Sequence, residues 1–413
     1  PIRMAGQTVN GGSLHPPITI AGLSARVMDR IAALPSPLAR PVAIAALLAV
    51  AALVQWWLMP FVTSDIVEFN VPWFRHIVAT GAVAAFAAPF ANYTPPYLYL
   101  LALATPLHGL IGDDQVIKAV AIACALMLAA ASWRLIARAG GAGRQGLLVL
   151  ALPSVTLNVA LLGQCDSLYA APCLMAVAAA LDRRHRAMLV WSGLALAVKA
   201  QAVLIAPFVL AVLIARRVPF GQWLFAPAAF LGALAPAWAT GWPLGDLLTV
   251  YLHQAETFTD LARNAPNLWM LLQSLGPMPP GLTIIGLALT GVAVAAYIVR
   301  ASKLLPEASR PVLLRLALLA PLLAAGLLPK MHDRYFFLAD ALALVLAAVV
   351  RDRDTIQIAI LVQAGSTGAV FAYVSGLALF AQFGAVAMIA ATWLVVRPLL
   401  PSRAPTLTAE ARA

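Results

Sequence analysis

The sequence predicts an all-α, polytopic membrane protein, and three observations support this fold class. Hydrophobic residues make up 62% of the 413 residues, and charged residues make up only 10%. Apolar runs of membrane-spanning length recur from residue 41 to residue 397, and no long polar segment separates them. We therefore expect a single transmembrane domain at residues 41–398, between cytoplasmic tails at residues 1–40 and 399–413.

The basic residues fit a membrane protein better than a nucleic-acid-binding protein. The formal net charge is +11, but Lys and Arg gather in short segments between apolar runs, such as residues 134–144 and 182–186. Cytoplasmic loops of membrane proteins carry this excess of positive charge. We therefore expect membrane lipids, and no nucleic acid, as partners. The three cysteines fall in or beside spans, which favours packing over a disulfide framework or a metal cluster.

The first predicted span covers residues 41–61. The preceding segment is rich in Pro and Gly and shows no cleavage-type signal, so we expect the span to remain as an anchor that runs from inside to outside. The next apolar stretch, residues 95–112, begins with two prolines and is short for a crossing. Counting it as a crossing would place Arg134 and Arg138 outside, against the positive-inside rule. We therefore predict a re-entrant or interfacial helix there.

The remaining apolar segments then alternate across the membrane. Residues 187–215 are interrupted by Lys199 and Gln201 and have Arg-rich flanks on both sides, which predicts two short helices that enter and return. The predicted topology has twelve crossings, with both termini in the cytoplasm. The other predicted spans are residues 114–138, 147–162, 167–181, 222–240, 280–300, 311–328, 336–351, 355–377 and 380–397.

The first outward segment contains two carboxylates that are candidates for chemistry. Asp65 and Glu68 are three residues apart, so they share one face of a helix. A carboxylate held at this place could take a proton from a hydroxyl nucleophile, with the second group orienting it. The alternative is a capping box, in which Asp65 caps a helix lying on the membrane and Glu68 completes the cap.

Two further polar groups lie at the breaks between short spans. Gln164 and Asp166 could bind the hydroxyls of a sugar, or Asp166 could simply cap the next helix. An ammonium near membrane depth costs about 2.5 to 3.5 kcal/mol and normally faces a cavity or a partner. Lys199 could therefore bind a lipid phosphate, with Gln201 adding a hydrogen bond, unless it only reaches the interface by snorkelling.

The segment PKMHDRYFF begins at Pro329 and is dense in polar groups. Arg334 could bind a phosphate with its fork of donors, and Lys330 and His332 could contribute to the same site. Interfacial anchoring is the alternative. In the outward loop before it, Asn264 and Asn267 could close over a substrate, or the loop could serve only as part of an aromatic belt.

Six segments, in this order, resemble the GT-C glycosyltransferases. They are SDIVEFNVPW, PFANYTPPYLYLL, GQCDSLYA, LALAVKAQA, NAPNLW and PKMHDRYFF, and they span residues 64–337. The resemblance is to the bacterial integral-membrane enzymes akin to the GPI mannosyltransferases and the dolichol-linked glucosyltransferases. It implies a GT-C fold, with a large first outer loop that bears juxtamembrane helices.

The resemblance also implies an activity, a place and a set of roles. The activity is inverting transfer of a hexosyl or pentosyl group from a polyprenyl monophosphate donor to a lipid- or glycan-linked hydroxyl acceptor, in glycan biosynthesis. The enzyme would lie in the bacterial inner membrane with a periplasmic active site. Asp65 would be the general base and Lys199 and Arg334 would hold the phosphate. The resemblance carries sugar or acceptor binding over to Gln164, Asp166 and Tyr335, and phosphate binding over to His332. From residue type and position alone, the candidate set also includes Lys330 for the phosphate and, for the sugar or acceptor, Glu68, Gln201, Asn264 and Asn267.

Three expectations remain open alongside this hypothesis. Asp333 stands where the family usually has Glu, so its role is not carried over. No cofactor is expected, and a divalent metal between Asp65 and Asp166 is the disfavoured alternative. The rival functions are a membrane transporter of an anionic or lipid-linked substrate and a polysaccharide ligase or polymerase that uses a lipid diphosphate.

Overall fold

The computed structural model describes residues 41–256, 261–276, 279 and 281–400. The predicted N-terminal tail, and the C-terminal tail from residue 401, lie outside these residues. Within them the chain is almost entirely helical, and the only strands are β1 (Ala262–Arg263) and β2 (Met331–His332). The predicted all-α fold class is therefore confirmed for the described chain.

Seven helical segments among the described residues are long and apolar enough to cross a membrane. They are α2 (Pro41–Leu58), α5 (Asp113–Ala139), α10 with α11 (Phe220–Thr240), α14 with its last turn (Leu282–Glu307), α15 (Arg310–Leu327), α17 (Arg353–Ser375) and α18 with its last turn (Leu379–Leu399). These segments make the chain a multi-pass membrane protein.

The other predicted spans are also helical but shorter or bent. They are α7 (Asp166–Leu181), α8 (His185–Val198), η7 with α9 (Ala200–Ala215), α16 (Phe337–Val350), and a pair, Gly143–Ala151 and Pro153–Leu161, that bends by 55°. Because a full crossing needs about 20 apolar residues, these segments are below the usual length. The count of twelve crossings therefore stays a prediction.

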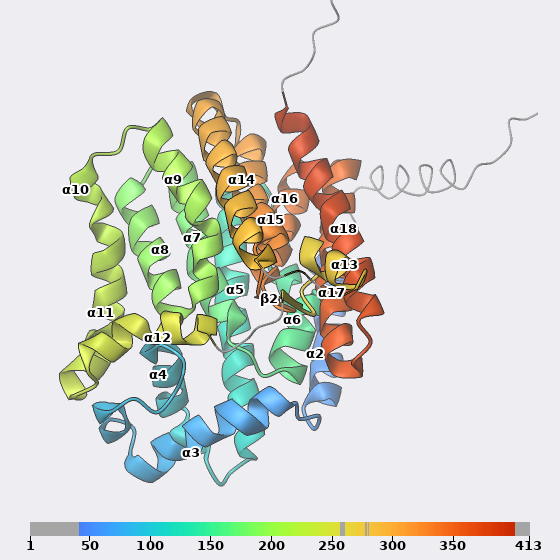
Figure 1. Ribbon diagram of the computed structural model, residues 1–413. Coiled ribbons are helices and arrows are strands. Elements are labelled where there is room, and N and C mark those ends of the chain that lie inside the picture. The colour runs from blue at the N-terminus through green and yellow to red at the C-terminus, as the bar shows by residue number, and fades with distance from the viewer. Residues whose placement is uncertain (1–40, 257–260, 277–278, 280, 401–413) are drawn as a thin grey trace, which may run out of the picture.

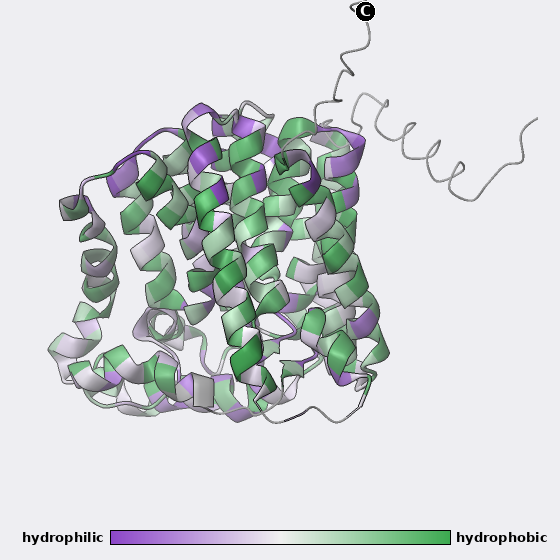
Figure 2. Ribbon diagram, turned by 45° about the horizontal axis from the view of Figure 1, so that its top comes forward, coloured by the Kyte–Doolittle hydropathy of each residue, from purple (hydrophilic) through white to green (hydrophobic). Residues whose placement is uncertain are grey.

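The helices form one bundle with a layer of short helices across one end (Figure 1). The layer contains α3 (Val71–Thr80), α4 (Pro95–Leu103) and α12 (Leu244–Glu256), and we call this end of the bundle the α3 end. Hydrophilic residues gather at the two ends of the bundle, and hydrophobic residues fill the band between them (Figure 2). With only 9 residues, α4 agrees with the prediction that this apolar stretch does not cross the membrane.

Local sequence explains where the long helices begin and end. α5 begins with Asp113 and Asp114, has Arg138 in its last turn, and stops at Gly140, whose φ of 93° is left-handed. Carboxylates at the start and a cation at the end both complement the helix dipole, and glycine adopts the left-handed cap without strain. α17 begins where the Asp352 side chain accepts a hydrogen bond from the Thr355 amide at 2.7 Å.

Small residues let α17 and α18 approach closely. A Cβ added at Gly384 of α18 would lie 2.8 Å from the carbonyl oxygen of Gly365 in α17, and one added at Gly368 would lie 2.7 Å from the carbonyl oxygen of Phe380. Such contacts between backbones are typical of helix packing in membranes. They hold α17 in the position from which Tyr373 reaches the site described next.

A pair of two-residue strands joins two distant loops. β1 and β2 pair in parallel, with Ala262 opposite Met331 and Arg263 opposite His332. The Lys330 amide also donates to the Leu261 carbonyl at 2.7 Å. The loop after α12 is therefore fixed to the loop between α15 and α16.

Candidate active site

Most of the predicted site residues meet at one cavity, which we call the central cavity. It has a volume of about 320 Å³ and lies where α8 ends and where α7 and α16 begin. Its wall receives side chains from the segment after α2, from the break between α8 and η7, and from the loop before α16. The predicted residues at its wall are Asp65, Glu68, Gln164, Lys199, Gln201, His332, Arg334 and Tyr335.

Asp65 lies at the centre of a hydrogen-bond network. Its Oδ2 accepts from Arg334 Nη1 at 2.8 Å and from Gln164 Nε2 at 3.3 Å, and its Oδ1 accepts from the Tyr373 hydroxyl at 3.2 Å. Partial burial would raise the pKa of Asp65, but the Arg334 guanidinium and the Tyr373 hydrogen bond outweigh it and leave the pKa below its ordinary value. Asp65 is therefore ionised at neutral pH.

The capping-box alternative for Asp65 is wrong. Asp65 has helical dihedral angles and makes no side-chain cap bond, because its carboxylate points to Arg334 instead. It is followed by a π-helical turn, η2 (Ile66–Asn70), which leads directly into α3. Wide turns of this kind often occur at functional sites. Glu68, within this turn, lines the same cavity as Asp65, as their spacing predicted.

Lys199 is buried and paired. The backbone is extended at Lys199 (φ −158°, ψ 139°), which separates α8 from η7 and turns the side chain inward. Its Nζ lies 2.5 Å from Asp166 Oδ1, and the two side chains are only 6% and 1% exposed. The ammonium also lies 5.4 Å from the centre of the Tyr93 ring. The prediction that the Lys199 ammonium snorkels to the interface is therefore wrong. The prediction that it faces a cavity and a partner is confirmed, and the partner is Asp166.

Asp166 has a different place from the one predicted. It does not line the central cavity, so it cannot meet a sugar there directly. Its Oδ1 accepts from Lys199, and its Oδ2 accepts from Asn158 Nδ2 at 2.7 Å. It also makes no cap bond, since Cys165 is the N-cap of α7. Asp166 acts as the buried counter-ion of Lys199, because a buried ammonium needs compensation.

The PKMHDRYFF segment divides between two cavities. Arg334 and His332 line the central cavity, but Lys330 does not and instead lines the groove described below. Lys330 has a left-handed φ of 60°, a conformation that non-glycine residues seldom adopt. Its predicted place beside Arg334 at a shared phosphate is therefore not observed.

Two groups in this segment have pKa values far from the ordinary. Burial, with help from the Arg334 charge, lowers the pKa of His332 to about 4, so His332 is neutral at pH 7. Burial raises the pKa of Asp333 to about 6, although Arg334 opposes the shift from 3.9 Å away. His332 can therefore donate a hydrogen bond to a phosphate but adds no charge.

Asn264 and Asn267 do not line the central cavity. Asn267 is buried, caps α13 (Leu268–Gln273) by accepting from the Met270 amide, and donates to the carbonyls of Ala325 and Leu328 at 3.3 and 3.2 Å. Asn264 forms a β-bridge with His332. Both asparagines therefore hold the loop in place, and the prediction that they contact substrate is not supported by their positions.

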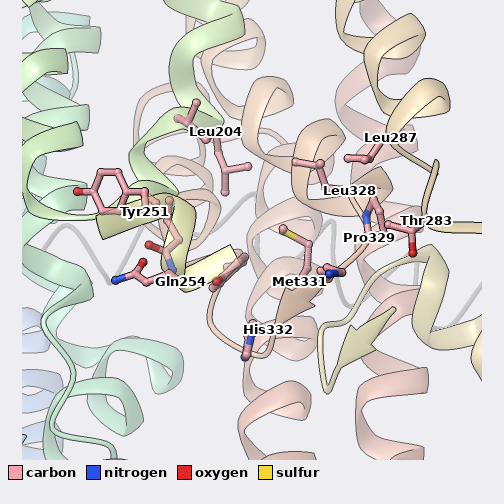
Figure 3. A pocket seen from close by; sticks show the side chains of 14 residues that line it. Leu204, Tyr251, Gln254, Thr283, Leu287, Leu328, Pro329, Met331 and His332 are labelled. Atoms are coloured by element: carbon pink, nitrogen blue, oxygen red, sulfur yellow. The ribbon is translucent and has the colours of Figure 1, made fainter. Parts of the chain in front are cut away.

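An apolar groove adjoins the central cavity (Figure 3). This aliphatic groove has a volume of about 400 Å³ and shares Gln201, Gln254, His332 and Tyr335 with the central cavity. In Figure 3 the side chains of Leu204, Leu287 and Leu328 lie on one side of it, and Gln254 and His332 lie on the other. Val203 and Leu287 also line it and are more than half exposed on the apolar surface of the bundle.

Sequence reasoning missed several wall residues of the central cavity. Tyr373 comes from α17 and bonds to Asp65, yet it is a single tyrosine near the end of an ordinary apolar span. Tyr93, Trp73 and Gln254 also line the cavity. The quoted segments PFANYTPPYLYLL and SDIVEFNVPW contain Tyr93 and Trp73, but no local pattern distinguishes Gln254 or Tyr373.

Among the described residues, no group of three or more His, Cys, Asp or Glu side chains could hold a metal ion. The expectation of a metal-free site stays a prediction. The chain matches no protein-family model, and no curated protein matches it. The geometry of the central cavity and the order of the six sequence segments are therefore the observations that bear on function.

Proposed function

We propose that the chain is an inverting glycosyltransferase of the GT-C type that moves a hexosyl or pentosyl group from a polyprenyl monophosphate to a hydroxyl acceptor. The observation that carries the proposal is the central cavity. There the ionised Asp65 lies beside the cations Lys199 and Arg334, and the cavity adjoins an aliphatic groove at the apolar surface. The order of the six sequence segments supports the same assignment.

The two adjoining spaces fit the two parts of such a donor. A polyprenyl chain is apolar and would occupy the aliphatic groove, which it could enter from the bilayer beside Val203 and Leu287. The phosphate would then lie at the junction of the groove and the cavity, near His332 and Arg334. Arg334 uses Nη1 for Asp65 and has further N–H groups for phosphate oxygens.

The reaction follows from the charges. The acceptor oxygen bonds to the anomeric carbon from the face opposite the phosphate, and the carbon–oxygen bond to the phosphate breaks with its electron pair. Lys199 and Arg334 stabilise the negative charge that grows on the leaving phosphate. Asp65 takes the acceptor proton. Because its pKa is low, it takes the proton only as the new bond makes the hydroxyl more acidic.

The proposed topology places the α3 end at the periplasmic face of the bacterial inner membrane and both termini in the cytoplasm. The supporting observation is the position of the basic loops. The segments around Arg138, Arg184 and Arg216 follow helices that run away from the α3 end, so they lie at the opposite end of the bundle. A donor flipped to the outer leaflet would reach the site laterally.

Donor turnover by purified protein in lipid nanodiscs tests the proposal. Short-chain polyprenyl phosphate glucose, mannose and arabinofuranose are supplied with a membrane-lipid extract as acceptor source, and mass spectrometry measures released polyprenyl phosphate. Asp65→Asn should lower turnover by about 100-fold or more, because general-base catalysis contributes about 10²–10⁴. Glu68→Gln, at the same cavity but outside the Asp65 network, is the matched control and should have a much smaller effect.

Three results would contradict the proposal. Turnover by Asp65→Asn at the wild-type rate would remove the base. Stronger competition by polyprenyl diphosphate sugars than by monophosphate sugars would favour a ligase or polymerase. Movement of the donor between leaflets without chemical change would favour a transporter. Adding EDTA to the same assay tests whether turnover needs a divalent metal.

A further inference from the structure

A second cavity of distinct character lies at the α3 end, and we call it the aromatic cavity. Its volume is about 700 Å³, within the range of about 300–1,000 Å³ that is typical of ligand sites. Phe69, Trp73, Phe90 and Trp242 line it, together with the polar side chains of Asn92, Asp246 and Gln254. The catalytic roles proposed above use none of these seven residues.

The aromatic side chains form a fixed wall. Phe90 is stacked on His76 with ring centres 4.6 Å apart, and it contacts Trp242 at 5.6 Å. Trp242 is 1% exposed, and its indole N–H has no hydrogen-bond partner among the described residues. Trp73 is held between Phe69 and Tyr93 at 6.0 and 5.1 Å. Rings held from several sides keep their orientation without a ligand.

Polar side chains also line the aromatic cavity. Asn92 and Asp246 are exposed, and the Asp246 carboxylate has no hydrogen-bond or ion-pair partner within the described ranges. Gln254 donates to the Asn92 backbone carbonyl and keeps its amide oxygen available. The cavity therefore offers flat apolar rings together with a carboxylate and amides that can bind hydroxyl groups.

This combination matches a sugar ring. A pyranose or furanose has a face of C–H groups that packs on aromatic rings, and hydroxyl groups at its edge that donate to carboxylates and amides. A lipid chain fits less well, because it would leave the Asp246 charge against an apolar group. The aliphatic groove, with Leu204, Leu287 and Leu328, offers a chain the better site.

The aromatic cavity adjoins the catalytic one. Phe69, Trp73, Asn92 and Gln254 line both the aromatic cavity and the central cavity. We infer that the aromatic cavity binds a sugar unit of the acceptor, so that the acceptor of the transferred group is itself a carbohydrate. This inference rests on the proposed transferase function, because only a transferase needs an acceptor here.

Binding can be measured without any donor. Saturation-transfer difference NMR of the full chain in lipid nanodiscs is run with the methyl glycosides of glucose, mannose, galactose and arabinofuranose as probes. At least one glycoside should receive saturation on its ring C–H protons.

Two substitutions test the location. Asp246→Asn removes the charge without changing shape and should weaken binding by about tenfold or more, as expected for a charge-assisted hydrogen bond. Ala91→Trp should fill the cavity and abolish binding, since Ala91 lines only this cavity. The matched controls are Asp114→Asn and Ala88→Trp, which lie near the α3 end but outside the cavity, and both should bind normally.

Several outcomes would overturn the inference. The first is that no glycoside binds to the wild type. The second is that a glycoside binds to Asp246→Asn as tightly as to the wild type. The third is that an acetylated Gly-Ser-Gly peptide binds more tightly than any glycoside and that Ala91→Trp blocks this peptide. Should Ala91→Trp fail to fold, Asp246→Asn still decides, because this exposed carboxylate packs against little. Sugar transfer without glycoside binding would refute this inference alone. Glycoside binding without donor turnover would refute the transferase proposal and leave a sugar site.

Discussion

The buried pair of Lys199 and Asp166 gives the sharpest energetic prediction. Lys199→Met and Asp166→Leu each remove one charge and keep similar side-chain volume, and the double variant removes both. In the wild type the charged atoms are 2.5 Å apart and almost fully buried. The two single variants should therefore be strongly destabilised, whereas the double variant should be close to the wild type.

The magnitudes follow from the contacts. At an effective dielectric constant of about 20 the attraction at this distance is about 7 kcal/mol, and desolvation of the two ions offsets most of it. Removing one partner leaves the other buried, at a cost of about 3–5 kcal/mol. Lys199→Met should lie at the lower end, because Asp166 keeps its bond to Asn158. Asp166→Leu should lie at the upper end, because it removes the one carboxylate that bonds to the ammonium within the described chain, and the Tyr93 ring 5.4 Å away replaces it only weakly.

Unfolding of the four proteins by SDS in mixed micelles, followed by tryptophan fluorescence, measures these free energies. The coupling energy from the double-mutant cycle should exceed about 3 kcal/mol. The control pair is Arg138 with Asp182, which are 3.0 Å apart but 47% and 24% exposed. Its coupling energy should stay below about 1 kcal/mol. If the cost of the double variant equals the sum of the single costs, the buried pair does not act as one unit and the reasoning is refuted.

Three further predictions concern pH and packing. Arg334→Gln removes the cation that lowers the pKa of Asp65. The acid limb of the pH dependence of kcat/KM should therefore move to higher pH. If this limb does not move, Asp65 does not titrate in the reaction. Asp333 has a pKa of about 6 when folded and an ordinary value of 3.8, so its charge costs stability above pH 6. Asp333→Asn should therefore raise the free energy of unfolding at pH 7.5, by at most about 3 kcal/mol, and change it little at pH 4; a larger gain at pH 4 would contradict the burial argument. Gly384→Ala should destabilise the protein by about 1–3 kcal/mol, because its Cβ would lie 2.8 Å from a backbone oxygen of α17. Gly291→Ala, which meets nothing within 4 Å, should be neutral or stabilising, and equal thermal midpoints for the two would refute the close-packing argument.

Hydrophobic patterning predicted the helices well, because apolar length is a property of each segment alone. The break at Lys199 could also be predicted, since an ammonium inside an apolar run has few alternatives to a cavity or a partner. The identity of the partner could not be predicted. Asp166 precedes Lys199 by 33 residues, and nothing local distinguishes a counter-ion from a sugar ligand.

The site shows the same limit. Asp65, Gln164 and Arg334 could each be selected by residue type at the mouth of a span, and the structure joins them by hydrogen bonds. Tyr373 could not be selected, because a tyrosine near the end of a span is equally typical of an interfacial anchor. Asn267 was predicted to contact substrate, but it holds the loop in place. Its capping and carbonyl contacts depend on the packing of α13 against α15, which the sequence does not reveal.

The break at Lys199 also has a consequence for how the protein is made. The helices on its two sides, α8 and η7 with α9, are shorter than the about 20 residues of a full crossing, so we expect them to enter the bilayer together as a hairpin. The chain emerges from the ribosome with α7 first, and Asp166 is therefore in place before Lys199 arrives. The earlier helix supplies the charge that makes insertion of the later hairpin favourable. Assembly of this half of the bundle should consequently follow the order of synthesis, and a nascent chain lacking the Asp166 carboxylate should stall with residues 185–215 exposed to the translocon and to quality-control proteases.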